Sequence, residues 1–429
     1  MMDNGVATPD TRETGPVVPV SASGKTRIAS LDFIRGIAVM GILAANIVAF
    51  GQPMTAYMWP DGFLVPAGDP DDVMWAIQFV LVDGKMRGLF TLLFGAGMYL
   101  FMEKAWAKGA GRGLQARRLF WLLLFGAVHF FLIWQGDILV SYALAGFIAL
   151  GCLKWRAKTQ LIIGILGYIS GAILALPAMA GPYLASETQF AEAMGGSETI
   201  EMLEEGKQAE IDDAMEEAAL IQSGDYGGYV SHVAAQHSSN LAFYLFLAFT
   251  ETIPLMLIGM ALYRRGLFDG GIARGRLLTW GWIGVIAGSA LTVLIAFWTI
   301  ETGMTYYGTL AGFMGFSPLP RLPVIVGLAA LLTAYLTAAG HFLGDRITAA
   351  GRAAFTNYLG TSIVLLPVFH GWGLGLFGEL DRPQLYLVML AVWVLILLWS
   401  KPWLERFRYG PLEWLWRCLT YGKLFPIRR

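Results

Sequence analysis

Ten apolar stretches divide this chain, and a cluster of basic residues follows every second one. Stretches of about 20 apolar residues are typical of helices that cross a lipid bilayer. The ten stretches lie at about 31–50, 75–102, 119–136, 138–153, 160–184, 240–263, 277–300, 321–340, 354–377 and 384–400. Charged residues interrupt the second stretch, which can instead form a short helix over 73–82 and a span from about 86 to 102. The sequence therefore predicts an all-α, polytopic membrane helical bundle of about ten transmembrane helices.

Lysine and arginine residues alternate from one side of this predicted bundle to the other. Twenty-four of the 30 lie before the first stretch or after the second, fourth, sixth, eighth and tenth. The intervening loop 51–72 has none, and the long loop 185–239 has only Lys207. Because cytoplasmic loops of membrane proteins carry the excess of positive charge, we predict that both termini are cytoplasmic. We place the chain in the cell (inner) membrane.

The composition supports the membrane class and excludes others. Apolar residues make up 56% of the chain and charged residues only 14%, which is too apolar for a soluble monomer of this size. A net charge of −1 argues against a nucleic-acid partner, and two cysteines are too few for a disulfide framework. His232 and His237 are five residues apart in the long loop, but two histidines make a weak metal motif, so we predict no metal site.

Two segments lie outside the predicted membrane helices. Residues 1–27 are rich in Thr, Pro, Gly and Ser without periodicity, which predicts a disordered cytoplasmic tail. Residues 28–429 form the membrane domain, and its extracytoplasmic loop 185–239 holds twelve Asp and Glu residues. Residues 198–222 of this loop have a helical pattern. We expect either a solvated helix that caps the bundle, or a lid or docking surface.

Several polar side chains fall at the depth of the outer third of the membrane, where unpaired polar groups are costly. Asn46 comes from the first stretch, Lys85 and Arg87 from the second, and His129 and Asp137 from the third. We predict that these five residues meet in one polar cluster. His129 is the candidate general base because imidazole exchanges protons near neutral pH. The alternatives are hydrogen bonds between packed helices and, for the two cations, anchors at the membrane surface.

Charged residues at the inner end and in mid-membrane form two further candidate sites. Asp32 and Arg35 are three residues apart in the first turns of the first stretch, so they can pair on one helix face. The alternative is that they bind an anionic ligand from the cytosol. Glu251 falls in mid-membrane in the sixth stretch, where a carboxyl group must be partnered, protonated or catalytic.

Five strings of residues carry a resemblance to a known family. They are Leu31-Asp32-Phe-Ile-Arg35 up to Asn46, Gly84-Lys-Met-Arg87 up to Gly95, His129-Phe-Phe-Leu-Ile-Trp-Gln-Gly-Asp137, Gly351-Arg-Ala-Ala-Phe-Thr-Asn357, and Phe407-Arg-Tyr-Gly-Pro-Leu-Glu413. Together they resemble the YeiB-like family, the domain of unknown function 418, over about residues 27–429. The motif in the first stretch is also similar to that of two groups of transmembrane acyltransferases, the heparan glucosaminide acetyltransferase type and the acyltransferase-3 type.

This second resemblance implies transfer of an acyl group, such as acetyl, from cytosolic acyl-CoA to an extracytoplasmic or lipid-linked acceptor. It places Asn46 at the active-site asparagine of the first type. The histidine that this type carries eleven residues later is Tyr57 in this chain, and the histidine of the second type would stand at Asn46. We therefore expect His129 to act in place of the missing histidine.

The resemblance and the positions of the polar residues together suggest roles in acyl transfer. The expected residues are His129, Asn46 and Asp137 for catalysis, Asp83, Lys85 and Arg87 for binding the acceptor, and Arg35, Arg352 and Asn357 for binding acyl-CoA. The expected partners are the lipid bilayer, a small-molecule, glycan or lipid acceptor, and a second copy of the chain in a homodimer.

Two other classes of function remain open. One is a transporter or exporter of a small molecule or lipid, with a proton path through Glu251, His129 and Asp83. The other is a non-catalytic membrane scaffold that docks a partner on the acidic loop. Thermal stabilisation by acyl-CoA would separate the enzyme from both.

Overall fold

The computed structural model describes residues 28–66, 70–191, 193, 196–236, 245–336 and 342–429. The predicted tail 1–27, residues 240–244 of the sixth stretch, residues 337–340 of the eighth stretch, and His237 lie outside these ranges. Within them the fold is all-α, and the one β-type contact is an isolated bridge between Phe407 and Arg428. The helices are α1 Ala29–Gly51, α2 Pro70–Leu81, α3 Lys85–Trp106, α4 Arg112–Leu132, α5 Leu139–Cys152, α6 Ala157–Ser186, α7 Gly196–Ser223, α8 Tyr226–Gln236, α10 Ile253–Arg264, α11 Arg274–Glu301, α12 Tyr306–Leu310, α13 Pro318–Leu336, α14 Phe342–Arg352, α15 Ala354–Phe369, α16 Arg382–Arg406 and α17 Pro411–Tyr421.

The chain is a multi-pass membrane protein. Among the described residues, six helices are long and apolar enough to cross a bilayer: 29–51, 157–186, 245–264, 274–301, 318–335 and 382–406. Helix occupies the described part of each of the ten predicted stretches, but α5 and α15 are shorter apolar helices. The second stretch breaks as the alternative reading expected, because Gly84 adopts a left-handed conformation (φ 70°) between α2 and α3. A total of ten crossings stays a prediction.

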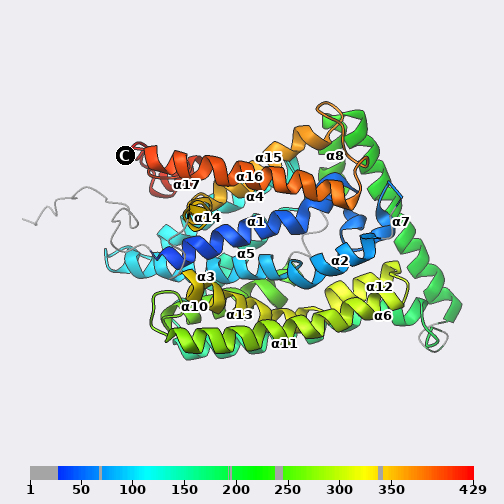
Figure 1. The fold of residues 1–429 in the computed structure, drawn as a ribbon, viewed down its shortest axis with the longest axis horizontal. Coiled ribbons are helices and arrows are strands. Elements are labelled where there is room, and N and C mark those ends of the chain that lie inside the picture. The colour runs from blue at the N-terminus through cyan, green and yellow to red at the C-terminus, as the bar shows by residue number, and fades with distance from the viewer. Residues whose placement is uncertain (1–27, 67–69, 192, 194–195, 237–244, 337–341) are drawn as a thin grey trace, which may run out of the picture.

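Helix α1 lies in the middle of the bundle (Figure 1) and contacts α3, α13, α14, α15 and α16. Its most apolar window is 78% buried, against 22% for α11 and 28% for α6 and for α16. These outer helices expose large apolar side chains such as Leu174, Trp280 and Leu294. An apolar surface that extends along several helices is expected to face lipid rather than water.

Glycines allow the central helices to approach closely. A Cβ atom on Gly259 of α10 would lie 1.9 Å from the carbonyl oxygen of Leu92 on α3, and one on Gly351 of α14 would lie 1.7 Å from that of Asp32 on α1. Small residues at crossing points are the usual means by which membrane helices pack backbone against backbone. These crossings fix how α3, α10 and α14 are placed around the centre.

The acidic loop contains the predicted helix. Helix α7 lies across the end of the bundle that is far from the C-terminus (Figure 1). Two contacts join it to the bundle. The amide of Gln135, in the turn between α4 and α5, donates to both carboxylate oxygens of Glu217 at 2.8 and 2.6 Å, and the hydroxyl of Tyr307 on α12 donates to the Leu203 carbonyl at 2.6 Å. The loop therefore caps this end of the bundle.

Candidate functional site

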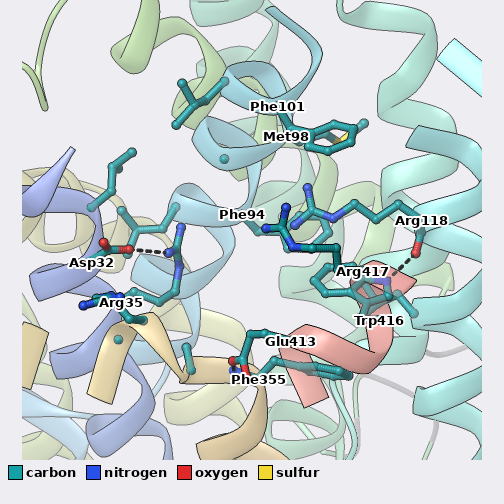
Figure 2. Close-up of a pocket in the computed structure, with 18 of the residues that line it drawn as sticks. Asp32, Arg35, Phe94, Met98, Phe101, Arg118, Phe355, Glu413, Trp416 and Arg417 are labelled. Carbon is teal, nitrogen blue, oxygen red and sulfur yellow. Dashed lines mark hydrogen bonds and ion pairs between the residues drawn. The ribbon is translucent and has the colours of Figure 1, made fainter. Parts of the chain in front are cut away.

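A cavity of about 300 Å³ opens at the end of the bundle where the C-terminal helix α17 packs (Figure 2). It lies between α1, α3, α4, α5, α15 and α17. Among the described residues that line it, six are basic and two are acidic: Arg35, Lys104, Arg118, Arg352, Arg408 and Arg417, and Asp32 and Glu413. The side chains of Arg35 and, opposite it, Arg118 and Arg417 point into the same space. The mouth of this cavity carries an excess of positive charge.

The two acidic side chains already have partners. Asp32 pairs with Arg35 at 3.1 Å, which confirms the predicted i,i+3 contact. Glu413 of α17 accepts hydrogen bonds from the backbone N–H groups of Phe355 and Thr356, at 2.8 and 3.2 Å, and from the Thr356 hydroxyl. Its carboxylate therefore satisfies two backbone N–H groups at the start of α15 that have no partner within the helix. These hydrogen bonds join α17 to α15, the helix that carries Tyr358 and Ser362.

Two aromatic rings contact the Arg118 guanidinium in the lining of the large cavity. The guanidinium carbon of Arg118 lies 4.2 Å from the ring centre of Trp416 and 4.8 Å from that of Phe101. The Trp416 indole N–H donates to the Arg118 carbonyl at 2.8 Å. A stacked guanidinium keeps its N–H edge available for a planar or phosphate oxygen ligand.

The inner wall of the cavity is apolar and ends at two tyrosines, Tyr142 and Tyr358. The Tyr358 hydroxyl accepts a hydrogen bond from the backbone N–H of Ile138 at 3.1 Å. The centre of its ring is 5.4 Å from that of the His129 imidazole. Tyr358 therefore separates the large cavity from His129.

Beyond Tyr358, three side chains form a hydrogen-bonded line that is almost entirely buried. His129 Nδ1 lies 2.8 Å from an Asp137 carboxylate oxygen, and His129 Nε2 lies 2.8 Å from Ser362 Oγ. Their exposed fractions are 0%, 3% and 2%. The second Asp137 oxygen accepts the Val140 N–H at 2.7 Å, so the first turn of α5 fixes the carboxylate. A serine, a histidine and an aspartate in this order have the geometry of a nucleophile, its base and the group that orients the base.

Ser362 lies at the boundary of two small cavities. The inner one, about 10 Å³, is lined by Asn46, Tyr358, Thr361 and Ser362 among others. The outer one, about 20 Å³, also contains Ser362 and extends to residues of α7, α8 and the end of α15. Each has about the volume that one water molecule occupies. Tyr358 lines both the large cavity and the inner small one, so the three cavities follow one another from one end of the bundle toward the other.

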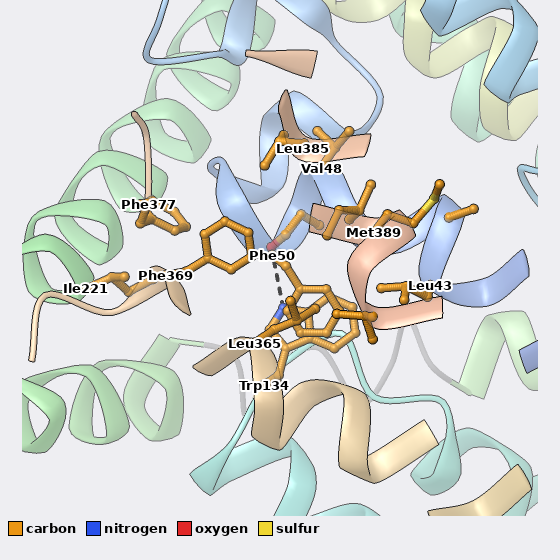
Figure 3. Close-up of a cluster of buried hydrophobic side chains, with 14 of the residues drawn as sticks. Leu43, Val48, Phe50, Trp134, Ile221, Leu365, Phe369, Phe377, Leu385 and Met389 are labelled. Carbon is orange, nitrogen blue, oxygen red and sulfur yellow. Dashed lines mark hydrogen bonds between the residues drawn. The ribbon is translucent and has the colours of Figure 1, made fainter. Parts of the chain in front are cut away.

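An apolar cluster surrounds these small cavities (Figure 3). Phe50 of α1 stacks on Trp134 with ring centres 4.0 Å apart, and the Trp134 indole N–H donates to the Ala49 carbonyl at 3.4 Å. Leu365 and Phe369 of α15 are buried in the same cluster. Packing of this kind gives the surroundings of Ser362 a low dielectric constant, which strengthens each electrostatic contact there.

The predicted single cluster of Asn46, Lys85, Arg87, His129 and Asp137 is divided into three groups. The Lys85 ammonium donates to the Phe79 carbonyl, and the Arg87 guanidinium pairs with Glu251 at 2.7 Å. Both cations lie in the first turn of α3. There Lys85 faces the end of α2 and Arg87 faces the π-helix at 248–252, so neither side chain points toward His129 on α4. Only Asn46 stays close to His129 and Asp137, since it lines the inner small cavity together with Ser362.

The residues expected to bind acyl-CoA and the acceptor also separate. Arg35 and Arg352 both line the large cavity. Asn357 does not: it is 2% exposed, its amide donates to the Ala350 carbonyl, and its oxygen accepts from the Trp399 indole. Asp83 is 1% exposed and accepts from the Gln78 amide at 3.1 Å. Asn357 and Asp83 therefore sit in packing contacts between helices.

Three features of the site did not emerge from the sequence. Ser362 was one hydroxyl within an apolar stretch, and Arg118 and Arg417 were members of basic clusters 299 residues apart. A signal was present for Ser362: it follows Tyr358 by four residues, so both lie on one face of α15, directly after the family string that ends at Asn357.

Comparisons with known proteins agree with the resemblance. The model of the family described as protein of unknown function (DUF418) matches residues 262–423. The chain is 31% identical to the uncharacterized protein YeiB of Escherichia coli (strain K12), over 93% of this chain and 98% of that protein. It is 30% identical to the uncharacterized protein YxaH of Bacillus subtilis (strain 168), over 94% of this chain and 96% of that protein. No solved structure matches the chain.

Proposed function

This chain belongs to the YeiB-like DUF418 family, and from that premise we propose that it is a membrane acyltransferase. It takes an acyl group from cytosolic acyl-CoA and delivers it to an acceptor at the outer half of the membrane. The end that holds α17 and the large cavity is then cytoplasmic, as are both termini, and the acidic helix α7 faces the other side. Acetyl-CoA is the simplest donor.

The large cavity is the observation that carries this proposal. CoA combines several phosphates with a long, thin and largely uncharged arm that ends in the thioester. The cavity has basic side chains at its mouth and an apolar wall that leads inward to Tyr358. Guanidinium groups bind phosphates through two parallel hydrogen bonds. The basic mouth would therefore bind the phosphates, the apolar wall would contact the arm, and the thioester would lie toward the buried His129.

The chemistry of acyl transfer needs a base, a group that orients the base, and a donor for the oxyanion. We assign these roles to His129, Asp137 and Asn46. With Nδ1–H of His129 donating a hydrogen bond to the Asp137 carboxylate, Nε2 carries no proton and can accept one from the attacking group. Asn46 lines the cavity beside Ser362, so its amide can donate to the oxygen of the thioester carbonyl.

The contacts favour the enzyme over the transporter. The three groups of the alternative proton path each have a different partner: Glu251 pairs with Arg87, His129 with Asp137, and Asp83 with Gln78. The contacts of Asp83, Lys85 and Arg87 lead us to withdraw these three residues from binding the acceptor. We place only the reacting hydroxyl of the acceptor at the outer small cavity, beside Ser362.

Acetyl-CoA binding to the purified full chain tests the proposal. Acetyl-CoA should raise the melting temperature, and Arg118→Gln or Arg408→Gln should weaken its apparent affinity about tenfold or more, since a hydrogen bond to a charged group contributes about 1.5–3 kcal/mol. Arg276→Gln is the matched control, because it removes an exposed cation in the first turn of α11, away from the cavity lining.

Two results would contradict this proposal. One is that neither acetyl-CoA nor the longer octanoyl-CoA changes the melting temperature of the wild-type protein. The other is that Arg276→Gln weakens binding as much as the cavity variants do. Melting each variant without ligand shows whether a loss of binding reflects a loss of fold.

A further inference from the structure

We propose that Ser362 carries the acyl group as a covalent ester between the donor and the acceptor. This inference rests on the proposed function and adds a second step to it. His129 is then the base that serves Ser362 at both steps, rather than a base that meets the acceptor directly.

The first argument is the arrangement of the three side chains. Ser362 Oγ and His129 Nε2 are 2.8 Å apart, and His129 Nδ1 is 2.8 Å from Asp137. With the Nδ1 proton donated to Asp137, the Ser362 hydroxyl donates to Nε2. A serine hydroxyl is a weak nucleophile by itself, and a histidine in this position activates it by accepting its proton.

The second argument is which member of the line faces open space. Ser362 lines both small cavities, whereas His129 is not among the residues that line the large cavity or either small one. An acyl group that arrives from the large cavity past Tyr358 therefore meets the serine oxygen first. An acceptor that enters from the α7 side meets the same atom, because Ser362 also lines the outer small cavity.

The third argument concerns the neighbouring hydroxyl and amide. Thr361 lines the inner small cavity as well, but its hydroxyl donates to the Asn357 carbonyl at 2.7 Å, so it is committed to the helix backbone. No hydrogen bond joins the Asn46 side chain to another residue in the described part of the chain. Its amide remains available to stabilise the oxyanion that forms when Ser362 attacks a carbonyl.

The two half-reactions balance with acyl-CoA and an acceptor hydroxyl as the only reactants. In the first, Ser362 Oγ bonds to the thioester carbonyl carbon, its proton passes to His129 Nε2, and the carbon–sulfur bond breaks. The His129 proton then goes to the CoA thiolate, which leaves as the thiol. In the second, the acceptor oxygen attacks the serine ester, its proton passes to His129, and the bond to Ser362 breaks as that proton returns to Oγ.

The ester can be detected without knowledge of the acceptor, because the first half-reaction needs none. The purified full chain is incubated with acetyl-CoA labelled in the acetyl group, and in parallel with labelled octanoyl-CoA. At least one donor should leave a single acyl group on the peptide that contains Ser362, together with one equivalent of free CoA. An oxygen ester resists neutral hydroxylamine and is cleaved by alkaline hydroxylamine.

Three variants define the attachment site. Ser362→Ala should abolish the adduct while keeping the rise in melting temperature with acetyl-CoA. Ser362→Cys should restore an adduct that neutral hydroxylamine now removes, because it is a thioester. Thr361→Val is the matched control: it removes a hydroxyl from the same small cavity and should leave the adduct intact.

The outcomes separate this inference from the proposed function. An adduct that persists in Ser362→Ala, or that maps to Cys152 or Cys418, overturns the relay. Wild-type protein that binds acetyl-CoA and octanoyl-CoA but forms no adduct with either also overturns it, and leaves direct transfer from acyl-CoA to the acceptor as the reaction. Failure of the wild-type protein to bind either donor overturns both the relay and the proposed function.

Discussion

Both ring nitrogens of His129 are engaged, and its whole side chain is buried, because α4 and α15 meet where the α4–α5 turn returns Asp137 to the same depth. A histidine with neither contact would leave an unsatisfied polar group in an apolar interior, at a cost of about 1–3 kcal/mol. The line from Ser362 to Asp137 therefore stabilises the packing as well as supplying a reactive geometry. An assay of acyl transfer to Ser362 distinguishes the stabilising effect from the reactive one.

His370 differs from His129 in that burial is not offset by an ion pair. It follows the end of α15, and its ring packs on Tyr229 at 5.2 Å, on Tyr226 at 5.9 Å and on Trp372 at 6.0 Å. Glu217 of α7 lines the same small cavity. Burial lowers the pKa of His370 from 6.5 to about 4. The folded protein therefore holds this side chain neutral at pH values where the unfolded chain would protonate it.

A loss of stability on acidification follows from this pKa shift. Above about pH 6.5, His370 is neutral in both the folded and the unfolded state, and it takes nothing from the free energy of unfolding. As the pH falls toward about 4, the unfolded state binds a proton that the folded state does not, so the free energy of unfolding decreases. The melting temperature should fall between about pH 7 and pH 4.5, and it should fall less in His370→Phe, which keeps an aromatic ring but cannot titrate. Equal falls in both proteins would show that other groups cause the acid sensitivity.

At the scale of elements, the crossing of α3 and α10 sets the position of the Arg87–Glu251 pair. Gly95 of α3 faces the backbone of Met256, and Gly259 of α10 faces that of Leu92. Two glycines on opposite helices allow the backbones to touch, and this contact brings the start of α3 near the π-helix that carries Glu251. The ion pair is thus a consequence of small residues several turns away.

Substitution of Gly259 tests this crossing. In Gly259→Ala the new methyl group would lie 1.9 Å from the Leu92 carbonyl oxygen, so the helices must separate, and we expect a loss of about 1–3 kcal/mol in the free energy of unfolding. Gly360→Ala is the matched control within α15, because nothing lies within 4 Å of its added Cβ. Thermal melting in detergent should show a lower midpoint for the first variant and an equal or higher midpoint for the second. Equal midpoints would mean that the crossing tolerates a methyl group.

At the scale of the whole molecule, the two ends of the bundle differ in charge. The end with α17 gathers the basic cavity mouth, and the end with α7 carries the acidic helix. The excess of basic residues on cytoplasmic loops predicts which end faces the cytosol. If the assignment were reversed, the large cavity would open to the outside, and it could not receive the cytosolic acyl-CoA that we propose as the donor.

Cysteine labelling in intact cells checks this orientation. In a background of Cys152→Ala and Cys418→Ala, a cysteine at position 204 of α7 should react with a membrane-impermeant thiol reagent added outside. A cysteine at position 108, which follows α3 at the other end, should react only after the cells are opened. Both positions are exposed to solvent, so a difference in labelling reports the side of the membrane. Equal labelling of both in intact cells would rule out the proposed topology.

The sequence by itself determined which segments are helical, where the second stretch breaks, and which residues share an end of the bundle. Apolar length and the distribution of basic residues encode depth along the membrane normal, so Arg35 and Arg352 could be placed at one end and Asn46 and His129 toward the other. The spacing of three residues between Asp32 and Arg35 was also enough to predict their ion pair, because the geometry of a single helix brings these two side chains together.

Only the tertiary structure decided which polar groups meet. The His129–Ser362 contact joins residues 233 apart, and the Arg87–Glu251 pair joins residues 164 apart. Depth does not specify the direction in which a side chain points around its helix, nor which helix it faces, because lipid and neighbouring helices offer similarly apolar surroundings. Close crossings at glycines such as Gly259 and Gly351 decide that direction. This is why Lys85 and Arg87 lie outside the expected cluster, and why Ser362 contacts His129 within it.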